Sequence, residues 1–196
     1  MHPTRRSVLT SLLAVPPAML LKASGAFAQG APSPLPLTPS CGAQDAPTPS
    51  QTAGPFYKPA SPLKTNLKAD VQGGEPITLA GFVVDTQCRP IRGALVEIWH
   101  ADTAGAYDNA GFRLRGHQLA DEAGRWGFTT LVTAQYPGRT AHYHFRVQRP
   151  NGQPLITQLY FPDHPGNARD GLFDPALVMK VSREANQRLG RFDFVV

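Results

Sequence analysis

Residues 139–148 read Arg-Thr-Ala-His-Tyr-His-Phe-Arg-Val-Gln, and the strand-like run His142–Gln148 within them decides how the chain is interpreted. In an extended strand, residues i and i+2 lie on the same face, about 6.5–7 Å apart in Cα position. His142 and His144 therefore project together, while Tyr143 points to the opposite face. Two imidazoles that converge from one strand favour a shared metal ion over an accidental pair of core histidines.

Further strand-like runs surround this segment, at Ile77–Val84, Ala94–Trp99, Trp126–Val132, Leu155–Phe161 and Arg191–Val195. Turn signals separate the runs, among them the hairpin dipeptide Asn151-Gly152. The 18 Gly and 20 Pro argue against a helical bundle, because Pro removes a backbone donor and Gly raises the entropy lost on folding. We therefore predict an all-β domain, an antiparallel β-sandwich of the prealbumin or immunoglobulin-like type with long loops.

One short C-terminal helix is also compatible with the sequence. Residues 174–188 would form it, because Asp174 is a good N-cap and Pro175 would occupy the first helical position. Outside this segment we expect strands, turns and loops.

The first 28 residues are typical of a removable export signal. Arg5 and Arg6 precede the apolar stretch 8–21, and residues 26–28, Ala-Phe-Ala, provide a small-x-small cleavage site. The paired arginines predict the twin-arginine route, and thus a periplasmic or secreted protein. The apolar stretch is too short for a comfortable membrane span, so we expect no membrane contact in the mature form. The alternative is a cytosolic protein with an apolar, disordered start.

Removal of this signal would take the 19 basic residues to 16 against 14 acidic ones, with no run of Lys or Arg. That balance argues against nucleic acid as a partner. Residues 29–50 are rich in Pro, Ala, Ser and Thr and predict an extended arm, with the folded domain at 51–196. In an oxidising compartment the only two cysteines, Cys41 and Cys88, predict a disulfide between arm and sheet, the alternative being two unrelated buried thiols.

Two tyrosines could complete a metal site with the paired histidines. Tyr136 lies in the connection that leads into the histidine strand, and Tyr107 ends the polar stretch that follows Trp99. A phenol becomes a ligand once a strong Lewis acid removes its proton, and ferric iron is such an acid. Carboxylates are scarce nearby, which weakens a site made of two histidines and one carboxylate.

Three blocks of the sequence, taken in order, resemble the intradiol ring-cleavage dioxygenases, the family of catechol and protocatechuate 3,4-dioxygenases. The first block is residues 51–57 (QTAGPFY) and the third is residues 136–145 (YPGRTAHYHF). The second block lies within residues 81–107 and consists of the segments Gly81–Asp85, Gly93–Asp102 and Gly105–Tyr107. The resemblance extends over about residues 50–196 and includes both tyrosines and both histidines. It implies a β-sandwich with a mononuclear, non-haem Fe(III) ion between its layers.

The resemblance also implies roles for individual residues. Four residues match the protein ligands of the iron: Tyr107, Tyr136, His142 and His144. Tyr136 would be the phenolate that substrate displaces and that accepts a proton, and Arg139 would stabilise negative charge on the substrate. The substrate pocket would be bordered by Thr52, Gly54, Pro55, Arg139 and Gln158.

The implied reaction uses O2 to cleave a catechol-type ring between its two hydroxylated carbons, giving a cis,cis-muconate-type diacid. The partners are then a small aromatic diol and O2. The substituents on the ring stay open, and so does the oligomeric state, a homo-oligomer included.

Two other functions remain compatible with part of the sequence. An exported prealbumin-like β binding module without a catalytic metal would explain the middle block, but it gives no role to the paired histidines. A ferrous or zinc enzyme would add Glu97 or Asp102 to the histidines, although Glu97 is better interpreted as a solvated face residue. His100 and the pair Arg113 and Arg115 are interpreted as loop, rim or solvated residues.

Overall fold

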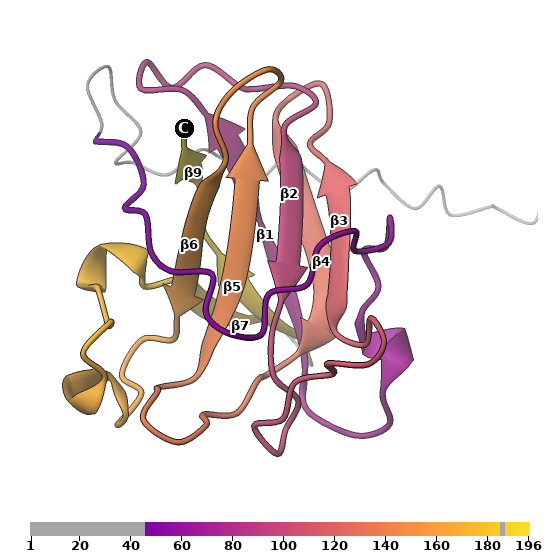
Figure 1. Ribbon diagram of the computed structural model, residues 1–196. Coiled ribbons are helices and arrows are strands. Elements are labelled where there is room, and N and C mark those ends of the chain that lie inside the picture. The colour runs from indigo at the N-terminus through magenta and orange to yellow at the C-terminus, as the bar shows by residue number, and fades with distance from the viewer. Residues whose placement is uncertain (1–45, 185–186) are drawn as a thin grey trace, which may run out of the picture. The chain divides into compact units, whose positions relative to one another are not determined.

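The computed structural model describes residues 46–184 and 187–196 (Figure 1). The predicted export signal, residues 29–45 of the predicted arm, and Cys41 lie outside the described residues. Cys88 is disulfide-bonded. Its predicted pairing with Cys41 stays a prediction. No helix in the described part of the chain combines the length and the apolar character needed to cross a membrane.

Nine strands and three short 3-10 helices make up the described regular structure. The strands are β1 (Pro76–Val84), β2 (Leu95–Trp99), β3 (Arg115–Leu119), β4 (Arg125–Leu131), β5 (His142–Gln148), β6 (Leu155–Tyr160), β7 (Lys180–Glu184), β8 (Gln187–Arg191) and β9 (Phe194–Val195). The 3-10 helices are η1 (Lys68–Asp70), η2 (Asn167–Arg169) and η3 (Pro175–Leu177). The chain is thus all-β, as predicted.

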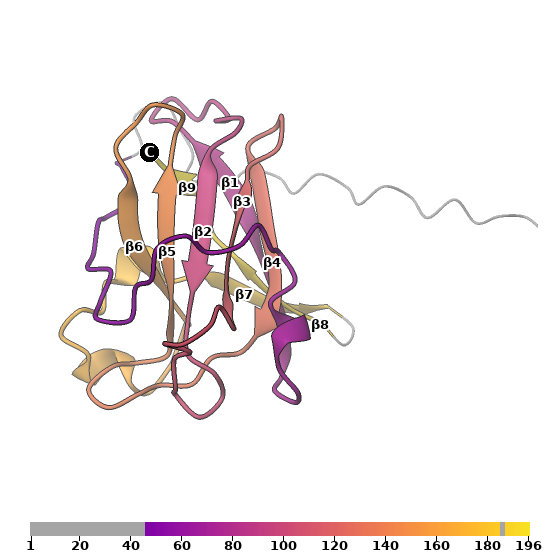
Figure 2. The same ribbon diagram turned by 45° about the vertical axis from the view of Figure 1, so that its right-hand side comes forward.

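The strands form two sheets that pack face to face (Figures 1 and 2). One sheet has the order β3-β2-β5-β6 and is antiparallel throughout. The other has the order β4-β1-β8-β7, with β9 also paired to β1. In this second sheet β1 pairs in parallel with β8 and β9, so the sandwich is confirmed but is not purely antiparallel.

Gly81 explains how two short strands can follow one another along β1. The chain crosses from β8 to β9 at Phe192, whose carbonyl oxygen would lie 1.7 Å from a Cβ atom at position 81. A side chain is therefore impossible there without a shift of the backbone. Because Phe192 occupies that space, the predicted single strand Arg191–Val195 is divided between the end of β8 and β9.

The helix that the sequence allowed over residues 174–188 does not form. Asp174 does act as a cap, since its side chain accepts a hydrogen bond from the Ala176 N–H, but η3 ends at Leu177. Leu177 and Met179 are both buried, and this two-residue period is that of a strand rather than a helix. The residues that follow form the hairpin of β7 and β8.

The core lies between the two sheets and takes the odd-numbered residues of β5. Tyr143, Phe145 and Val147 are fully buried in it, and the Tyr143 hydroxyl donates to the Leu131 carbonyl of the opposite sheet at 2.9 Å. The Phe145 ring lies 5.3 Å from the Trp126 ring. The even-numbered residues of β5, His142 and His144 among them, therefore face away from the core.

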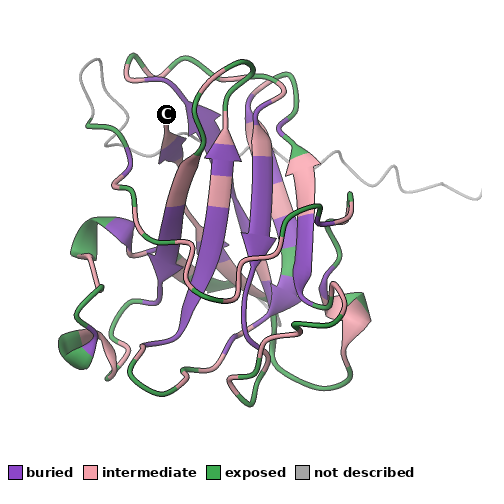
Figure 3. Cartoon of the chain, viewed as in Figure 1, coloured by how far each residue is buried: buried purple, intermediate pink, exposed green. Residues whose placement is uncertain are grey.

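A segment that we call the strap, residues 51–65, crosses the outer face of the sheet β3-β2-β5-β6 (Figure 1). The Gln51 N–H donates to the Ile156 carbonyl at one edge, and the His117 N–H donates to the Pro62 carbonyl at the other. Most of β5 is buried (Figure 3). His142 and His144 are 2% and 1% exposed. The resemblance implied an iron ion between the layers, but the two predicted histidine ligands face away from the other sheet, because Tyr143 and Phe145 occupy the inner side of β5.

Candidate metal centre

The paired histidines present two ring nitrogens to each other. The Nε2 atoms of His142 and His144 are 3.1 Å apart. His142 Nδ1 lies 2.7 Å from the Thr140 carbonyl oxygen, which can only accept, so the ring proton resides on Nδ1 and Nε2 carries a lone pair. His144 Nδ1 is buried without a hydrogen-bond partner among the described residues. A cation between the two Nε2 atoms would engage one nitrogen of each ring.

Burial keeps both imidazoles in the neutral form that binds metals. It lowers the pKa of His142 to about 4. Burial, reinforced by the charges of His142 and Arg139, holds the pKa of His144 well below its ordinary value. At neutral pH the outer face of β5 therefore offers two uncharged nitrogen ligands.

The two predicted tyrosine ligands lie beside these imidazoles. The Tyr107 ring is 6.2 Å from the His144 ring, the Tyr136 ring is 5.5 Å from the His142 ring, and the two phenol rings are 5.8 Å apart. Tyr107 comes from the loop after β2 and Tyr136 from the loop after β4. The fold therefore brings together four side chains that are spread over nearly 40 residues of sequence.

The donor set fits a hard, highly charged metal ion. The Tyr107 hydroxyl is buried with no partner among the described residues, and burial raises its pKa well above the ordinary value of a phenol. Such a hydroxyl loses its proton only to a strong Lewis acid. Within residues 46–184 and 187–196, no three His, Cys, Asp or Glu side chains gather as a metal site. The phenols of Tyr107 and Tyr136 are the oxygen donors whose rings lie beside the two imidazoles.

Aromatic side chains wall the site. Phe56, from the strap, stacks on Tyr107 with ring centroids 4.5 Å apart and meets Tyr136 edge-on at 5.9 Å. Trp99, from β2, stacks on His144 at 5.0 Å with the planes only 3° apart. These contacts fix the ring orientations and exclude water from the imidazoles and phenols.

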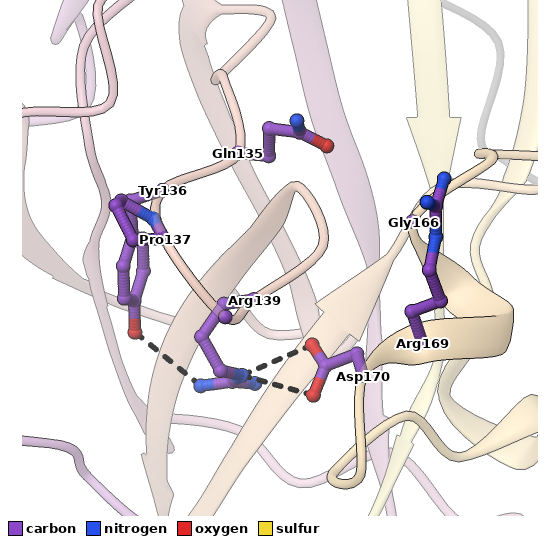
Figure 4. A pocket seen from close by; sticks show the side chains of 8 residues that line it. Gln135, Tyr136, Pro137, Arg139, Gly166, Arg169 and Asp170 are labelled. Atoms are coloured by element: carbon purple, nitrogen blue, oxygen red, sulfur yellow. Dashed lines mark hydrogen bonds and ion pairs between the residues drawn. The ribbon is translucent and has the colours of Figure 1, made fainter.

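Arg139 is held beside Tyr136 by a buried carboxylate (Figure 4). Its Nε lies 3.0 Å from both oxygens of Asp170, and its Nη1 lies 3.4 Å from the Tyr136 hydroxyl. Asp170 also accepts hydrogen bonds from the Thr140 and Leu172 N–H groups at 2.9 Å. Burial alone would raise the pKa of Asp170, but these hydrogen bonds and the guanidinium outweigh it and lower the pKa. Asp170 thus stays charged and orients Arg139.

The other end of Arg139 reaches the predicted substrate-pocket residues. Its Nη2 donates to Gln158 Oε1 and lies 3.4 Å from the Tyr160 hydroxyl. Gln158 Nε2 in turn donates to the Thr52 carbonyl at 3.0 Å. Three of the five predicted pocket residues, Arg139, Gln158 and Thr52, therefore form one chain of hydrogen bonds between β6 and the strap.

The remaining predicted pocket residues also lie on the strap. Gly54 has a φ of +68°, and a Cβ atom there would lie 3.3 Å from Cε1 of His144, so the bare backbone fits closely against a candidate ligand. Thr52 and Pro55 are exposed on either side of it, and Thr52 Oγ1 accepts from the Gly54 N–H at 3.1 Å. These residues therefore form the rim rather than the floor of the site.

Arg115 contradicts its interpretation as a solvated residue. Its side chain is 1% exposed, Nε donates to the Asp108 carbonyl at 3.1 Å, and Nη1 donates to the Phe56 carbonyl at 2.7 Å. Its guanidinium carbon is 5.9 Å from the Tyr107 ring centroid. Arg115 thus ties the strap to the loop that carries Tyr107. Because β3 was not predicted as a strand, the sequence offered no sign that this arginine points inward.

The sequence reasoning missed two further residues of the site and misread another. Tyr160 could have been found, because it follows Gln158 by two residues on the same strand and so shares its face. Asp170 carries no sequence signal, since it lies in a loop 31 positions after the arginine that it binds. His100 was interpreted as a loop or rim residue, but it is 1% exposed.

The two carboxylates of the alternative ferrous or zinc site are engaged elsewhere. Glu97 is 4% exposed, so its interpretation as a solvated residue is wrong; it lies 3.4 Å from the Tyr57 hydroxyl and 3.7 Å from Arg146 Nη1. Asp102 caps its own loop by accepting from the N–H groups of Ala104 and Ala106 at 2.9 and 3.0 Å. Neither carboxylate forms a three-residue metal site with the histidines within the described ranges.

Known proteins are similar to this chain in sequence and in fold. A catechol 1,2-dioxygenase of Candida albicans is 32% identical over 154 residues, which are 64% of this chain and 51% of the relative. The protocatechuate 3,4-dioxygenase beta chain of Burkholderia cepacia is 34% identical over 135 residues, 57% of each chain. The chain spans about half the length of the first curated relatives that it matches.

A solved structure covers the domain more fully. It is the dioxygenase domain of a dioxygenase and carbohydrate-binding protein fusion from Streptomyces sp. SirexAA-E, with a TM-score of 0.75 and 47% identity over 77% of this chain and 98% of that chain. The family profile described as "Dioxygenase" matches residues 52–188, well over half of the chain. The chain therefore belongs to the intradiol ring-cleavage dioxygenase family.

Proposed function

We propose that this protein is an exported dioxygenase that cleaves catechol-type rings between the two hydroxylated carbons. It would use one mononuclear, non-haem Fe(III) ion and O2, and its products would be cis,cis-muconate-type diacids. The observation that carries the proposal is the convergence of two neutral imidazoles and two phenols on the outer face of β5, next to Arg139.

The four converging side chains Tyr107, Tyr136, His142 and His144 would hold the ion. When bound, a ferric ion supplies the Lewis acidity that makes a catechol reactive toward O2. His142 keeps its proton on Nδ1, bound to the Thr140 carbonyl, so its Nε2 stays free as a ligand.

Tyr136 is the group best placed to accept a proton from the substrate. It is half-buried in a loop, and among the described residues its hydroxyl has one hydrogen-bond partner, Arg139 Nη1 at 3.4 Å. Tyr107 is packed more tightly, because Phe56 covers its ring and burial surrounds its hydroxyl. We therefore assign the proton to Tyr136 Oη and a fixed ligand role to Tyr107.

Arg139 would stabilise negative charge that develops on the ring. Asp170 and Gln158 hold its guanidinium from two sides, so the cation is oriented before the substrate arrives. A preorganised charge of this kind lowers a barrier without a cost of reorganisation. Phe56 and Trp99 add a dry wall that strengthens these electrostatic interactions.

The substrate class and the location also belong to this proposal. The names of similar proteins specify catechol, chlorocatechol, hydroxyquinol and protocatechuate, all aromatic rings with adjacent hydroxyl groups. Export rests on residues 1–28, and the disulfide at Cys88 suits an oxidising compartment.

Iron content, colour and product analysis test the proposal. The iron-loaded protein should be red-brown from phenolate-to-iron charge transfer, and catechol with labelled O2 should give a diacid that carries both labelled atoms. Tyr107→Phe and Tyr136→Phe should each change the colour. Tyr143→Phe is the matched control, because Tyr143 lies on β5 between the two histidines but faces the core, so this variant should leave the colour unchanged.

Two results would overturn the proposal. One is a colourless protein that contains one equivalent of iron, which would remove the phenolate ligands. The other is colour and ring cleavage retained in His142→Ala, which would remove the histidine ligand. A protein that binds no iron under any loading condition would instead support the metal-free β binding module.

A further inference from the structure

Thr140, which lies just before β5, connects the candidate metal centre to a loop that is distant in sequence. It is 1% exposed. Its carbonyl accepts from His142 Nδ1 at 2.7 Å, and its N–H donates to Asp170 at 2.9 Å. Asp170 in turn holds the guanidinium of Arg139. The backbone of this one residue therefore contacts both a candidate ligand and the carboxylate that orients Arg139.

These two hydrogen bonds belong to the two peptide planes that flank Thr140. The N–H lies in the plane before Cα and the carbonyl in the plane after it, so the φ and ψ angles of this residue set the angle between them. A group that fixes the side chain also restricts φ and ψ, because a β-branched side chain has few rotamers and each depends on the backbone. The contacts of the Thr140 hydroxyl therefore bear on both hydrogen bonds.

The hydroxyl is held by the η2 loop, residues 161–170. Thr140 Oγ1 lies 2.8 Å from Asn167 Oδ1 and 2.8 Å from His164 Nδ1. Asn167 Nδ2 donates to the Phe161 carbonyl at 3.0 Å, so it is the amide oxygen, an acceptor only, that faces the hydroxyl. Thr140 thus donates its one hydroxyl proton to Asn167.

The η2 loop is packed against this hydroxyl with no room to spare. A Cβ atom at Gly166 would lie 2.9 Å from Thr140 Oγ1 and 3.0 Å from His164 Nδ1. The Asn167 N–H donates to the His164 carbonyl at 3.0 Å, which braces the loop from within. The same loop ends at Asp170 (Figure 4). It therefore holds Thr140 through both the side chain and the N–H.

We propose that Thr140 is a positioning residue of the metal centre, whose hydroxyl lets the η2 loop set the directions of His142 Nε2 and of the Arg139 guanidinium. The inference rests on the proposed iron site and adds a residue that acts through His142 and Arg139. Loss of a partner that orients a metal-binding histidine typically lowers metal affinity or activity about 10- to 100-fold. We expect effects of this size when the hydroxyl is removed.

Two substitutions separate the hydroxyl from the shape of the side chain. Thr140→Val keeps the branched shape and removes the hydrogen bonds, whereas Thr140→Ser keeps the hydroxyl and removes a methyl group. Thr140→Val should raise the dissociation constant for ferric iron about 10- to 100-fold and shift the phenolate charge-transfer colour. With saturating iron, its kcat for catechol should fall by a similar factor while KM changes by less than about threefold. Thr140→Ser should stay within about threefold of the wild type in each measurement.

Thr48→Val is the matched control. Thr48 is also buried, and its Oγ1 accepts from the Val195 N–H of β9 at 2.8 Å, in the sheet that does not carry the histidines. This variant loses a buried hydroxyl and its hydrogen bond, as Thr140→Val does. Urea unfolding should show that both variants are destabilised, but Thr48→Val should leave iron affinity, colour and kcat unchanged. That contrast separates positioning from a general loss of stability.

The metal-free protein supplies a measurement that does not depend on the proposed reaction. In NMR spectra of the nitrogen-labelled protein, the His142 Nδ1 proton should exchange with water at least about fivefold faster in Thr140→Val than in the wild type, because the carbonyl that protects it is less firmly held. Gly166→Ala, whose Cβ atom would press on the hydroxyl from the loop, should give the same acceleration. This second variant decides if Thr140→Val does not fold.

Failure of the positioning role and failure of the enzyme are distinguishable. The role is wrong if the exchange of the His142 proton is accelerated by less than about fivefold, or if Thr140→Ser is as impaired as Thr140→Val. It is also wrong if Thr48→Val alters colour and iron affinity as much as Thr140→Val does. Each of these results leaves ring cleavage standing. If the wild type instead binds no iron and cleaves no catechol, the proton exchange alone decides whether Thr140 orients His142.

Discussion

Acidification should destabilise this protein through His100, a buried histidine next to the candidate metal centre. The neutral ring is fully satisfied, because Nδ1 lies 2.8 Å from the Ala101 carbonyl oxygen and Nε2 lies 2.7 Å from Thr130 Oγ1. Burial lowers the pKa of His100 from 6.5 to about 4. Between these two values the unfolded chain takes up a proton on this ring and the folded protein does not.

The sign and size of the effect follow from proton linkage. Because the unfolded state binds more protons in this window, the free energy of unfolding falls as the pH falls from about 6.5 toward about 4. The full loss for His100 is about 3 kcal/mol. About 2 kcal/mol of it should be lost between pH 7 and pH 5.

Urea unfolding of the wild type and of His100→Gln, followed by tryptophan fluorescence at pH 7, 6 and 5, measures this contribution. Gln retains hydrogen-bonding groups but does not titrate, so the variant should lose about 2 kcal/mol less than the wild type between pH 7 and 5. His142 and His144 are also buried and neutral, but they are common to both proteins and cancel in the comparison. Parallel pH profiles for the two proteins would refute the reasoning.

Three other perturbations have defined outcomes. Asp170→Ala leaves the Arg139 guanidinium without its buried partner. Urea unfolding should therefore show that the free energy of unfolding falls by about 3–5 kcal/mol, and kcat should fall as well. Unchanged stability would show that Asp170 is dispensable. Hydrogen bonds from the Gly111 and Arg113 N–H groups lower the pKa of Asp108 from 3.8 to about 2. The ionised carboxylate therefore stabilises the fold at pH values above 3.8. This contribution to stability is lost as the pH falls toward 2. Asp108→Asn should flatten acid unfolding in that window, and a steep profile in the variant would contradict this. Gly54→Ala places a Cβ atom 3.3 Å from His144 at a φ of +68°, which should displace the imidazole. The variant should therefore bind less iron and be less coloured. Full iron occupancy with wild-type colour would exclude so close a contact.

The sandwich was predictable wherever a strand carried apolar side chains. The runs that became β1, β2, β4, β5 and β6 are visible in the sequence because their residues are buried on at least one face. β3 was missed because Arg-Gly-His-Gln-Leu looks like a loop until Arg115 is known to be buried. The hairpin of β7 and β8 was missed because the signal at Asp174 and Pro175 belongs to a single 3-10 turn.

The candidate site was predictable to the extent that its residues are close in sequence or match a family pattern. His142, His144 and Arg139 lie within six positions. The two tyrosines were first suggested by phenolate chemistry, and the family resemblance then supported them. Asp170 and Arg115 were not predictable, because their partners lie across loops that only the fold brings together. The position of the site on the outside of the sheet could have been deduced, since the apolar side chains of Tyr143, Phe145 and Val147 require the core.

Side chains that form the core alternate along β5 with side chains that form the candidate site. One row of side chains supports the interior, and the adjacent row includes His142 and His144, which would hold the proposed ion beneath the strap. Rim and strap residues can therefore be exchanged on the outer face of the sheet, with effects on ligand binding, while the interior that stabilises the fold is left unaltered.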